Sequence, residues 1–120
     1  MKALLDTNFL MLPNQFGTDI FEYLKYHEAC TLSSCVDELK RIVRQRGKDS
    51  ASAKIALRLI EQNKIEIINS KERPVDKAIL NYALREKCLV GTNDKALIKA
   101  LKKNGIRIIR LKQKRYLVEE

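Results

Sequence analysis

Residues 3–5 form a short, continuously apolar run that leads directly into Asp6. Runs of this length and composition are typical of strands buried on both faces of a parallel sheet. In open α/β sheets, ligands bind in the crevice beyond the carboxyl ends of the strands, which is where Asp6 would lie. Asp6 and Asn8 are equally suited to shaping a turn, because short polar side chains bond the nearby backbone. The rest of the chain must decide between a site and a turn.

Apolar runs and amphipathic segments alternate along the chain. Further strands are predicted at residues 29–32, 65–68, 88–91 and 106–111, and helices at residues 19–27, 35–46, 49–62, 74–87 and 94–104. Ser33, Ser34 and Asp49 are candidate helix caps, and Pro13 and Gly17 predict a loop after Asp6. Alternating strands and helices are typical of a parallel sheet covered on both faces. We therefore expect an α/β fold, a three-layer α/β/α sandwich with about five parallel strands, in a single domain over residues 1–120.

The charge balance favours a polyanionic partner. The chain carries 24 Lys and Arg against 15 Asp and Glu, a formal net charge of +9. Nucleic acid is the first expectation, because a thermophilic surface raises both signs together and leaves this excess unexplained. No apolar run approaches bilayer-spanning length, so no membrane association is expected. Cys30, Cys35 and Cys88 lack a metal-ligand spacing, which indicates reduced thiols and a cytoplasmic protein without structural zinc.

Four acids fall at a strand end or near a helix start, namely Asp6, Glu38, Asp76 and Asp94. Glu38 flanks the apolar stripe of its helix, whereas the neighbouring Asp37 points nearly opposite. Asp76 lies in line with an apolar helix face, so we expect it to be buried beside a cation or a hydrogen-bond network. A simpler role stays open for the acids at helix starts, because they can bond free backbone amides.

The four acids can converge, because strand ends and helix starts meet at one edge of such a sheet. Grouped carboxylates raise at least one pKa or require a cation. A ligand set made only of oxygen suits Mg²⁺ or Mn²⁺ rather than zinc. Facing a phosphate, such a site is suited to metal-assisted phosphodiester cleavage.

These motifs resemble those of the PIN-domain ribonucleases. Leu4-Leu5-Asp6-Thr7-Asn8 is similar to the first acidic motif of the family, Asp37-Glu38-Leu39 to the second, and the span from Asp76 to Thr92-Asn93-Asp94 to the third and fourth. The resemblance implies a strand order of 3-2-1-4-5 and a Mg²⁺- or Mn²⁺-dependent endoribonuclease. The implied catalytic metal ligands are Asp6, Glu38, Asp76 and Asp94, with Asn8 and Thr92 in support.

Within the family, residues 5–9 and the ending Gln113-Lys114-Arg115-Tyr116 are most similar to one branch. This branch contains pre-ribosomal-RNA-processing nucleases and small archaeal relatives, some of which are VapC-type toxins. The resemblance accordingly implies RNA as substrate and either a pre-ribosomal particle or a small antitoxin protein as partner. The RNA target, the choice between these roles and the formation of a homodimer stay open.

Two other classes of protein are alternatives to a nuclease. A phosphatase of the haloacid dehalogenase type needs an acid two residues after Asp6, where this chain has Asn8. A non-catalytic, basic RNA-binding scaffold differs in binding RNA without cutting it in Mg²⁺ or Mn²⁺. Whether the protein cuts RNA or only binds it, a basic surface is expected to contact the phosphates, although lysines on a helix can simply be solvated. The residues of this surface are Lys95, Lys99, Lys102, Lys103, Lys112, Lys114 and Arg115.

Overall fold

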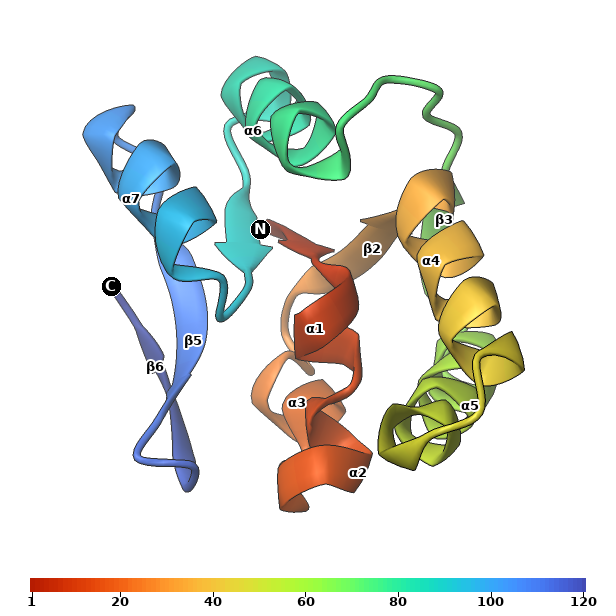
Figure 1. Ribbon diagram of the computed structural model, residues 1–120. Coiled ribbons are helices and arrows are strands. Elements are labelled where there is room, and N and C mark those ends of the chain that lie inside the picture. Colours follow the sequence, from red (N-terminus) through yellow and green to blue (C-terminus); the bar gives the residue numbers. More distant parts are fainter.

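The computed structural model describes residues 1–120 as one sheet with helices on both faces (Figure 1). The strands are β1 (Lys2–Leu5), β2 (Glu28–Leu32), β3 (Glu66–Ile68), β4 (Leu89–Gly91), β5 (Ile108–Lys112) and β6 (Tyr116–Glu119). The helices are α1 (Thr7–Leu10), α2 (Leu12–Phe16), α3 (Ile20–Tyr23), α4 (Ser33–Arg44), α5 (Lys48–Gln62), α6 (Val75–Glu86) and α7 (Lys95–Lys103). No helix is long and apolar enough to span a bilayer.

The strands follow the order β3-β2-β1-β4-β5-β6. The first five are parallel, and β6 runs antiparallel to β5. The predicted fold class and the order 3-2-1-4-5 are confirmed, and the sheet gains a sixth strand. Leu5 of β1 is paired with Gly91 of β4. Because both strands end at this pair, Asp6 and Thr92 leave the sheet side by side.

The two faces of the sheet bury alternate residues of the central strands, as the two-residue period of a strand requires. Ala3 and Leu5 pack into a core with residues of α1 to α5, such as Leu39. Leu4 and Val90 pack on the opposite face with residues of α6 and α7. Figure 1 shows α6 and α7 on one side of the sheet and α1, α2 and α3 on the other. The apolar run before Asp6 is therefore buried on both faces, as predicted.

The segment after Asp6 is helical, which corrects the predicted loop. Asp6 caps α1, because its side chain accepts a hydrogen bond from the amide of Thr7. Pro13 lies in the first turn of α2, where a missing N–H costs nothing, and Gly17 ends α2 with a φ of 64°. The helix predicted over residues 19–27 is only the short α3.

Two predicted helix caps are also wrong. Leu32, rather than Ser33 or Ser34, is the N-cap residue of α4. The Ser33 hydroxyl instead donates to the carbonyl of Ser70 at 3.2 Å and accepts from its amide at 2.9 Å. Asp49 does not cap α5 but lies in its first turn. These polar side chains are engaged with neighbouring segments, which a local capping rule does not take into account.

The strand β6 lies beyond the last strand predicted from the sequence. It forms a hairpin with β5, in which Leu111 is paired with Leu117. Gln113 and Lys114 take left-handed conformations with φ of 54° and 56°, which reverses the chain. No glycine marks this turn in the sequence, so the usual hairpin signal is missing.

Candidate active site

Asp6 stands at the end of β1 and is held by three hydrogen bonds. Its Oδ1 accepts from the Thr7 amide at 2.8 Å, and its Oδ2 accepts from Asn8 Nδ2 at 3.0 Å and from Thr92 Oγ1 at 2.8 Å. The residue is only 4% exposed. Both residues that were predicted to support the site therefore contact the Asp6 carboxylate and fix its orientation.

Further hydrogen bonds organise the segments that follow β1 and β4. The amide of Asn93 donates to Asn8 Oδ1 at 3.0 Å, and the amide of Asp94 donates to Thr92 Oγ1 at 3.1 Å. Asp94 Oδ1 accepts from the Leu97 amide at 3.0 Å and so caps α7. Asp94 thus serves as an N-cap while it stands at the same edge of the sheet as Asp6.

Asn93 ties this edge to the neighbouring strand β5. Its Nδ2 donates to the Leu111 carbonyl at 3.1 Å, and its Oδ1 accepts from the Leu111 amide at 2.9 Å. Asn93 was not predicted as a site residue. Its position between Thr92 and Asp94 was the available signal, but the contact with β5 follows from the fold alone.

Glu38 reaches the site from α4. The hydroxyl of Thr7 donates to Glu38 Oε1 at 2.7 Å, and Thr7 itself is buried. Asp37 is exposed, so the helical period identified correctly which of the two adjacent acids faces inward. Thr7 was not predicted as a site residue, yet it links Asp6 and Glu38 through its amide and its hydroxyl.

One cleft of about 270 Å³ collects the predicted acids at the carboxyl edge of the sheet. Its lining residues are Asp6, Thr7, Asn8, Met11, Gln15, Glu38, Ile42, Asp49, Asp76 and Asp94. Asp76 is exposed, which corrects the predicted buried position, and no cation pairs with it. Asp49 is a fifth acid in the cleft, which was predicted from the sequence only as a helix cap. Gln15 Nε2 donates to Asp49 Oδ1 at 3.4 Å.

The acids of the cleft disturb each other electrostatically. Burial raises the pKa of the Asp6 carboxyl to about 6, and the charges of Asp76 and Glu38 act in the same direction. The hydrogen bonds from Thr92 and Thr7 oppose this shift only in part. Desolvation also raises the pKa of Asp76, with Asp94 and Glu38 adding to the effect. The cleft therefore holds negative charge that a bound cation would stabilise.

The residues present fit a hard divalent cation by their donor chemistry. The cleft offers carboxylate, amide and hydroxyl oxygens, which Mg²⁺ and Mn²⁺ prefer, and no His or Cys. No group of three or more His, Cys, Asp or Glu side chains is arranged so that it could enclose a metal ion on its own. Mg²⁺ usually keeps several waters and binds through one or two carboxylates, so such an enclosure is not required.

Gly91 allows α1 to pack closely against the ends of β1 and β4. A Cβ atom at this position would lie 3.0 Å from Leu5 Cδ2 and 3.0 Å from both Cδ2 and Cε2 of Phe9. Leu5 and Phe9 are fully buried, so neither has free space to move into. The Gly91 carbonyl also accepts from the Asp6 amide at 2.9 Å. The absent side chain therefore sets how closely β1, β4 and α1 meet under Asp6.

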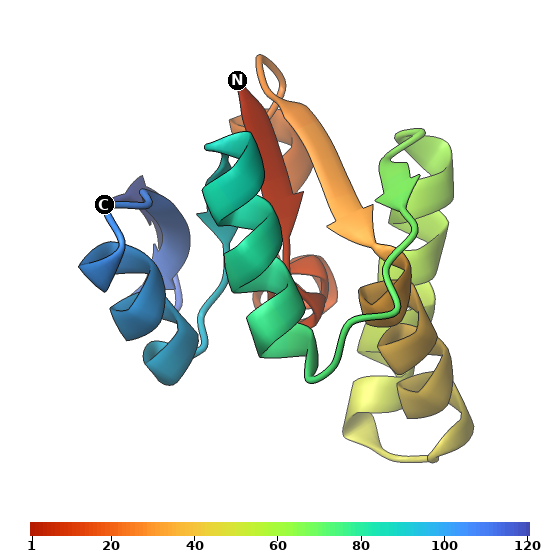
Figure 2. The same ribbon diagram turned by 90° about the horizontal axis from the view of Figure 1, so that it is seen from above.

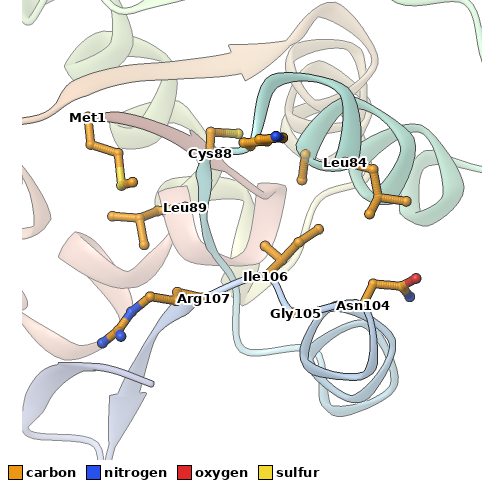
Figure 3. A pocket seen from close by; sticks show the side chains of 10 residues that line it. Met1, Leu84, Cys88, Leu89, Asn104, Gly105, Ile106 and Arg107 are labelled. Atoms are coloured by element: carbon orange, nitrogen blue, oxygen red, sulfur yellow. The ribbon is translucent and has the colours of Figure 1, made fainter.

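A separate hollow of about 390 Å³ lies at the amino edge of the sheet (Figure 3). It is mostly apolar and contains no carboxylate. Its lining residues are Met1, Ala83, Leu84, Lys87, Cys88, Leu89, Asn104, Gly105, Ile106 and Arg107.

Comparison with known proteins places the chain in a family. A family model described as "PIN like domain" matches residues 3–114. Ribonuclease VapC4 of Methanocaldococcus jannaschii is 34% identical over 124 aligned positions, which cover 96% of this chain and 93% of the relative. Ribonuclease VapC9 of Archaeoglobus fulgidus is 31% identical over 122 positions, which cover 98% and 88%.

A solved structure agrees with these matches. The structure of the PIN domain endonuclease Utp24 superimposes with a TM-score of 0.79 at 26% sequence identity. The match covers 99% of this chain and 90% of that chain. This protein belongs to the PIN-like domain family, and the curated relatives that it matches are ribonucleases.

Proposed function

We propose that this protein is a divalent-metal-dependent endoribonuclease that hydrolyses RNA phosphodiester bonds, with residues 1–120 forming one nuclease domain. The observation that carries the proposal is the convergence of Asp6, Glu38, Asp76 and Asp94 in one cleft, although they come from four separate segments. The names of the VapC4 and VapC9 relatives support RNA as the substrate. The net charge of +9 is suited to such a polyanion.

Asp6, Glu38, Asp76 and Asp94 would hold Mg²⁺ or Mn²⁺ in the cleft, either directly or through the waters that such a cation keeps. Such a cation, when bound, neutralises charge on the scissile phosphate and makes water a better nucleophile. Asp6 is kept in one orientation by Thr92 and Asn8, and Glu38 is kept in place by the hydroxyl of Thr7. Because these bonds exist before substrate binds, the orientations of Asp6 and Glu38 are set in advance.

We propose that the RNA also contacts the basic surface described from the sequence. Lys95, Lys99 and Lys103 are exposed and have no acid within ion-pair distance, and Lys95 directly follows Asp94 of the cleft. Lys102 and Lys112 pair with Glu120 at 2.8 Å and 3.3 Å, so their charges are partly neutralised. On the α7 side of the cleft, the unpaired lysines should therefore contribute most of the electrostatic attraction for the RNA phosphates.

Two cellular settings fit this activity. The VapC names of the curated relatives favour a toxin, with a small antitoxin protein as partner. The resemblance of residues 5–9 and 113–116 to pre-ribosomal-RNA-processing members of the family favours RNA processing, with a pre-ribosomal particle as partner. We propose a cytoplasmic location in either setting. Both settings use the same cleft and the same metal.

The proposal is tested by cleavage of a labelled single-stranded RNA in Mg²⁺, in Mn²⁺ and in chelator. Asp6→Asn and Asp94→Asn should each lower kcat/KM about 100-fold or more while RNA affinity falls little, since metal positioning matters most in the transition state. Asp37→Asn is the matched control, because Asp37 is exposed beside Glu38 but does not line the cleft.

Two results would contradict the proposal. Near-wild-type cleavage by Asp6→Asn, in a preparation from a nuclease-deficient host, would remove the assigned site. Tight RNA binding by the wild type without cleavage in either metal would favour the non-catalytic RNA-binding scaffold.

A further inference from the structure

A second hollow of about 260 Å³ adjoins the acid cleft at the connection between α4 and α5. Its lining residues are Ile42, Gln45, Arg46, Gly47, Lys48, Asp49 and Ser50. Ile42 and Asp49 line both this hollow and the acid cleft, so the two are adjacent. Figure 2 shows the α4–α5 connection (yellow) beyond the carboxyl ends of β1 and β2. A polymer that enters the cleft from this side must pass over the connection.

The connection carries cations that no acid neutralises. Arg46 and Lys48 line the hollow, and Arg41 lies three residues after Glu38, on the same side of α4. All three are exposed, and none forms an ion pair. Four basic residues at the other end of the sheet differ in this respect, because Glu119 and Glu120 pair with Lys102, Arg107, Arg110 and Lys112.

The connection is short and internally bonded. The amide of Ser50 donates to the Gly47 carbonyl at 3.1 Å, and the Ser50 hydroxyl donates to the Val43 carbonyl at 2.9 Å. Arg46 takes a left-handed conformation with a φ of 48°. These bonds hold the end of α4 against the start of α5, so the backbone that carries the cations is fixed beside the cleft.

Phosphates are the groups that this arrangement fits. The acid cleft alone repels an RNA backbone, because it gathers five carboxylates in one place. Unpaired cations beside it lower that barrier and give the strand a defined path. We propose that Arg41, Arg46 and Lys48 form a backbone-phosphate subsite that holds the RNA strand next to the acid cleft. The proposal rests on the ribonuclease function proposed above, and it names contacts that position the strand without reading its sequence.

The test compares two triple variants that remove the same charge. The first is Arg41→Gln, Arg46→Gln, Lys48→Gln, and the control is Lys40→Gln, Arg44→Gln, Lys54→Gln. The control residues lie on α4 and α5 and are exposed. They line neither the acid cleft nor the hollow beside it. Both sets are built in the full chain carrying Asp6→Asn, so that a fluorescent single-stranded RNA oligonucleotide stays intact. Its affinity is measured by anisotropy over a KCl series.

For single strands, each lost phosphate contact lowers the slope of log affinity against log salt by roughly 0.7, so the first set should lose up to about 2. The control should keep the slope of its parent. An unchanged slope in the first set, or an equal loss in the control, overturns the subsite. Lys48→Glu, a single exposed change, must also weaken binding, and thermal melts verify that every variant is folded.

A parallel cleavage assay separates this inference from the function on which it rests. Both triple sets are placed in the chain with Asp6 intact, and RNA cleavage is followed in Mn²⁺. If the chain with Asp6 intact and no other substitution cleaves RNA, and the salt slope of the first triple variant is unchanged, only the proposed subsite is contradicted. Absence of cleavage by the parent removes the proposed function, whatever the slopes are.

Discussion

The two edges of the sheet are both hollowed, but they differ in charge. β4 (Leu89–Gly91) runs from the amino-edge hollow of about 390 Å³, which Cys88 and Leu89 line, toward the acid cleft of about 270 Å³, where Thr92 follows the strand and contacts Asp6. The first is lined by five acids, and the second by none (Figure 3). The helices α6 and α7 begin at the first and end at the second, so their dipoles favour anions at one edge and cations at the other. The volume of a hollow therefore does not identify the candidate site, whereas a group of like charges without ion-pair partners does.

The largest expected effect is a pH dependence of stability that arises from Asp6 at the acid edge. The pKa of Asp6 is about 6 in the folded protein and about 3.9 when unfolded, so ionised Asp6 destabilises the native state. In chelator, the penalty should be absent below about pH 4, grow as the pH rises, and reach about 3 kcal/mol above pH 6. Urea unfolding of the wild type and Asp6→Asn at a series of pH values measures it. If the two proteins show the same pH dependence, Asp6 carries no such penalty.

The next effect concerns how Asp6 is held. Thr92→Val keeps the shape of a fully buried side chain but removes the donor to Asp6 and the acceptor for the Asp94 amide. We expect kcat/KM to fall about 10- to 100-fold, or about 1.4 to 2.7 kcal/mol. Because the Thr92 hydrogen bond lowers the pKa of Asp6, the acid limb of the pH–rate profile should move to higher pH. Loss of activity without that movement would assign Thr92 a packing role only.

A smaller effect is expected at Asp94, where two roles coincide. Asn can keep the capping bond to the Leu97 amide while removing one negative charge from the cleft. Asp94→Asn in chelator near neutral pH should therefore melt higher than the wild type by a degree or several. Added Mn²⁺ should reverse the order, because it binds the wild type better. Melts that respond to metal in neither protein would count against a cation site at this edge.

The smallest effect is expected at the amino edge. Leu84 is 41% exposed where it lines the hollow, so Leu84→Ser should change the free energy of unfolding by about 0.5 kcal/mol or less. RNA cleavage and its metal dependence should stay at wild-type values. A clear loss of cleavage in this folded variant would break the contrast between the two edges, since it would give the apolar hollow a part in the reaction.

The apolar runs predicted the five parallel strands and both helical layers, because a buried strand must be apolar on each face. They did not predict β6, whose strand Tyr116–Glu119 is stabilised by pairing with β5 and by ion pairs of Glu119 and Glu120. The helices α1 and α2 were missed because each is only about one turn long, and because Asp6 caps α1 while α2 has Met11 at its N-cap without a capping side-chain bond. Elements that depend on such partners leave little periodic signal in the sequence.

For the site, chain position predicted more than helical period did. Asp6 and Asp94 follow apolar strands, and the structure places both in the cleft. Asp76 was expected to be buried because it is in line with Ile79, but a first-turn residue extends past the sheet edge, where the cleft is open. Asp49 was missed because α5 is far from β1 along the chain, and only the packing of α5 beside α2 and α4 brings it to the cleft.

Gly91 has a consequence for which sequences can carry this cleft. A side chain there would press on Leu5 and Phe9 at 3.0 Å, and both are too tightly enclosed to yield. The resulting shift would move Asp6 relative to Thr92, although Gly91 itself offers no polar side chain. In a library of all single substitutions selected for RNA cleavage, position 91 should therefore tolerate almost nothing, as if it were a metal ligand. Evolution of this site is constrained by an atom that must be absent as well as by the carboxylates that must be present.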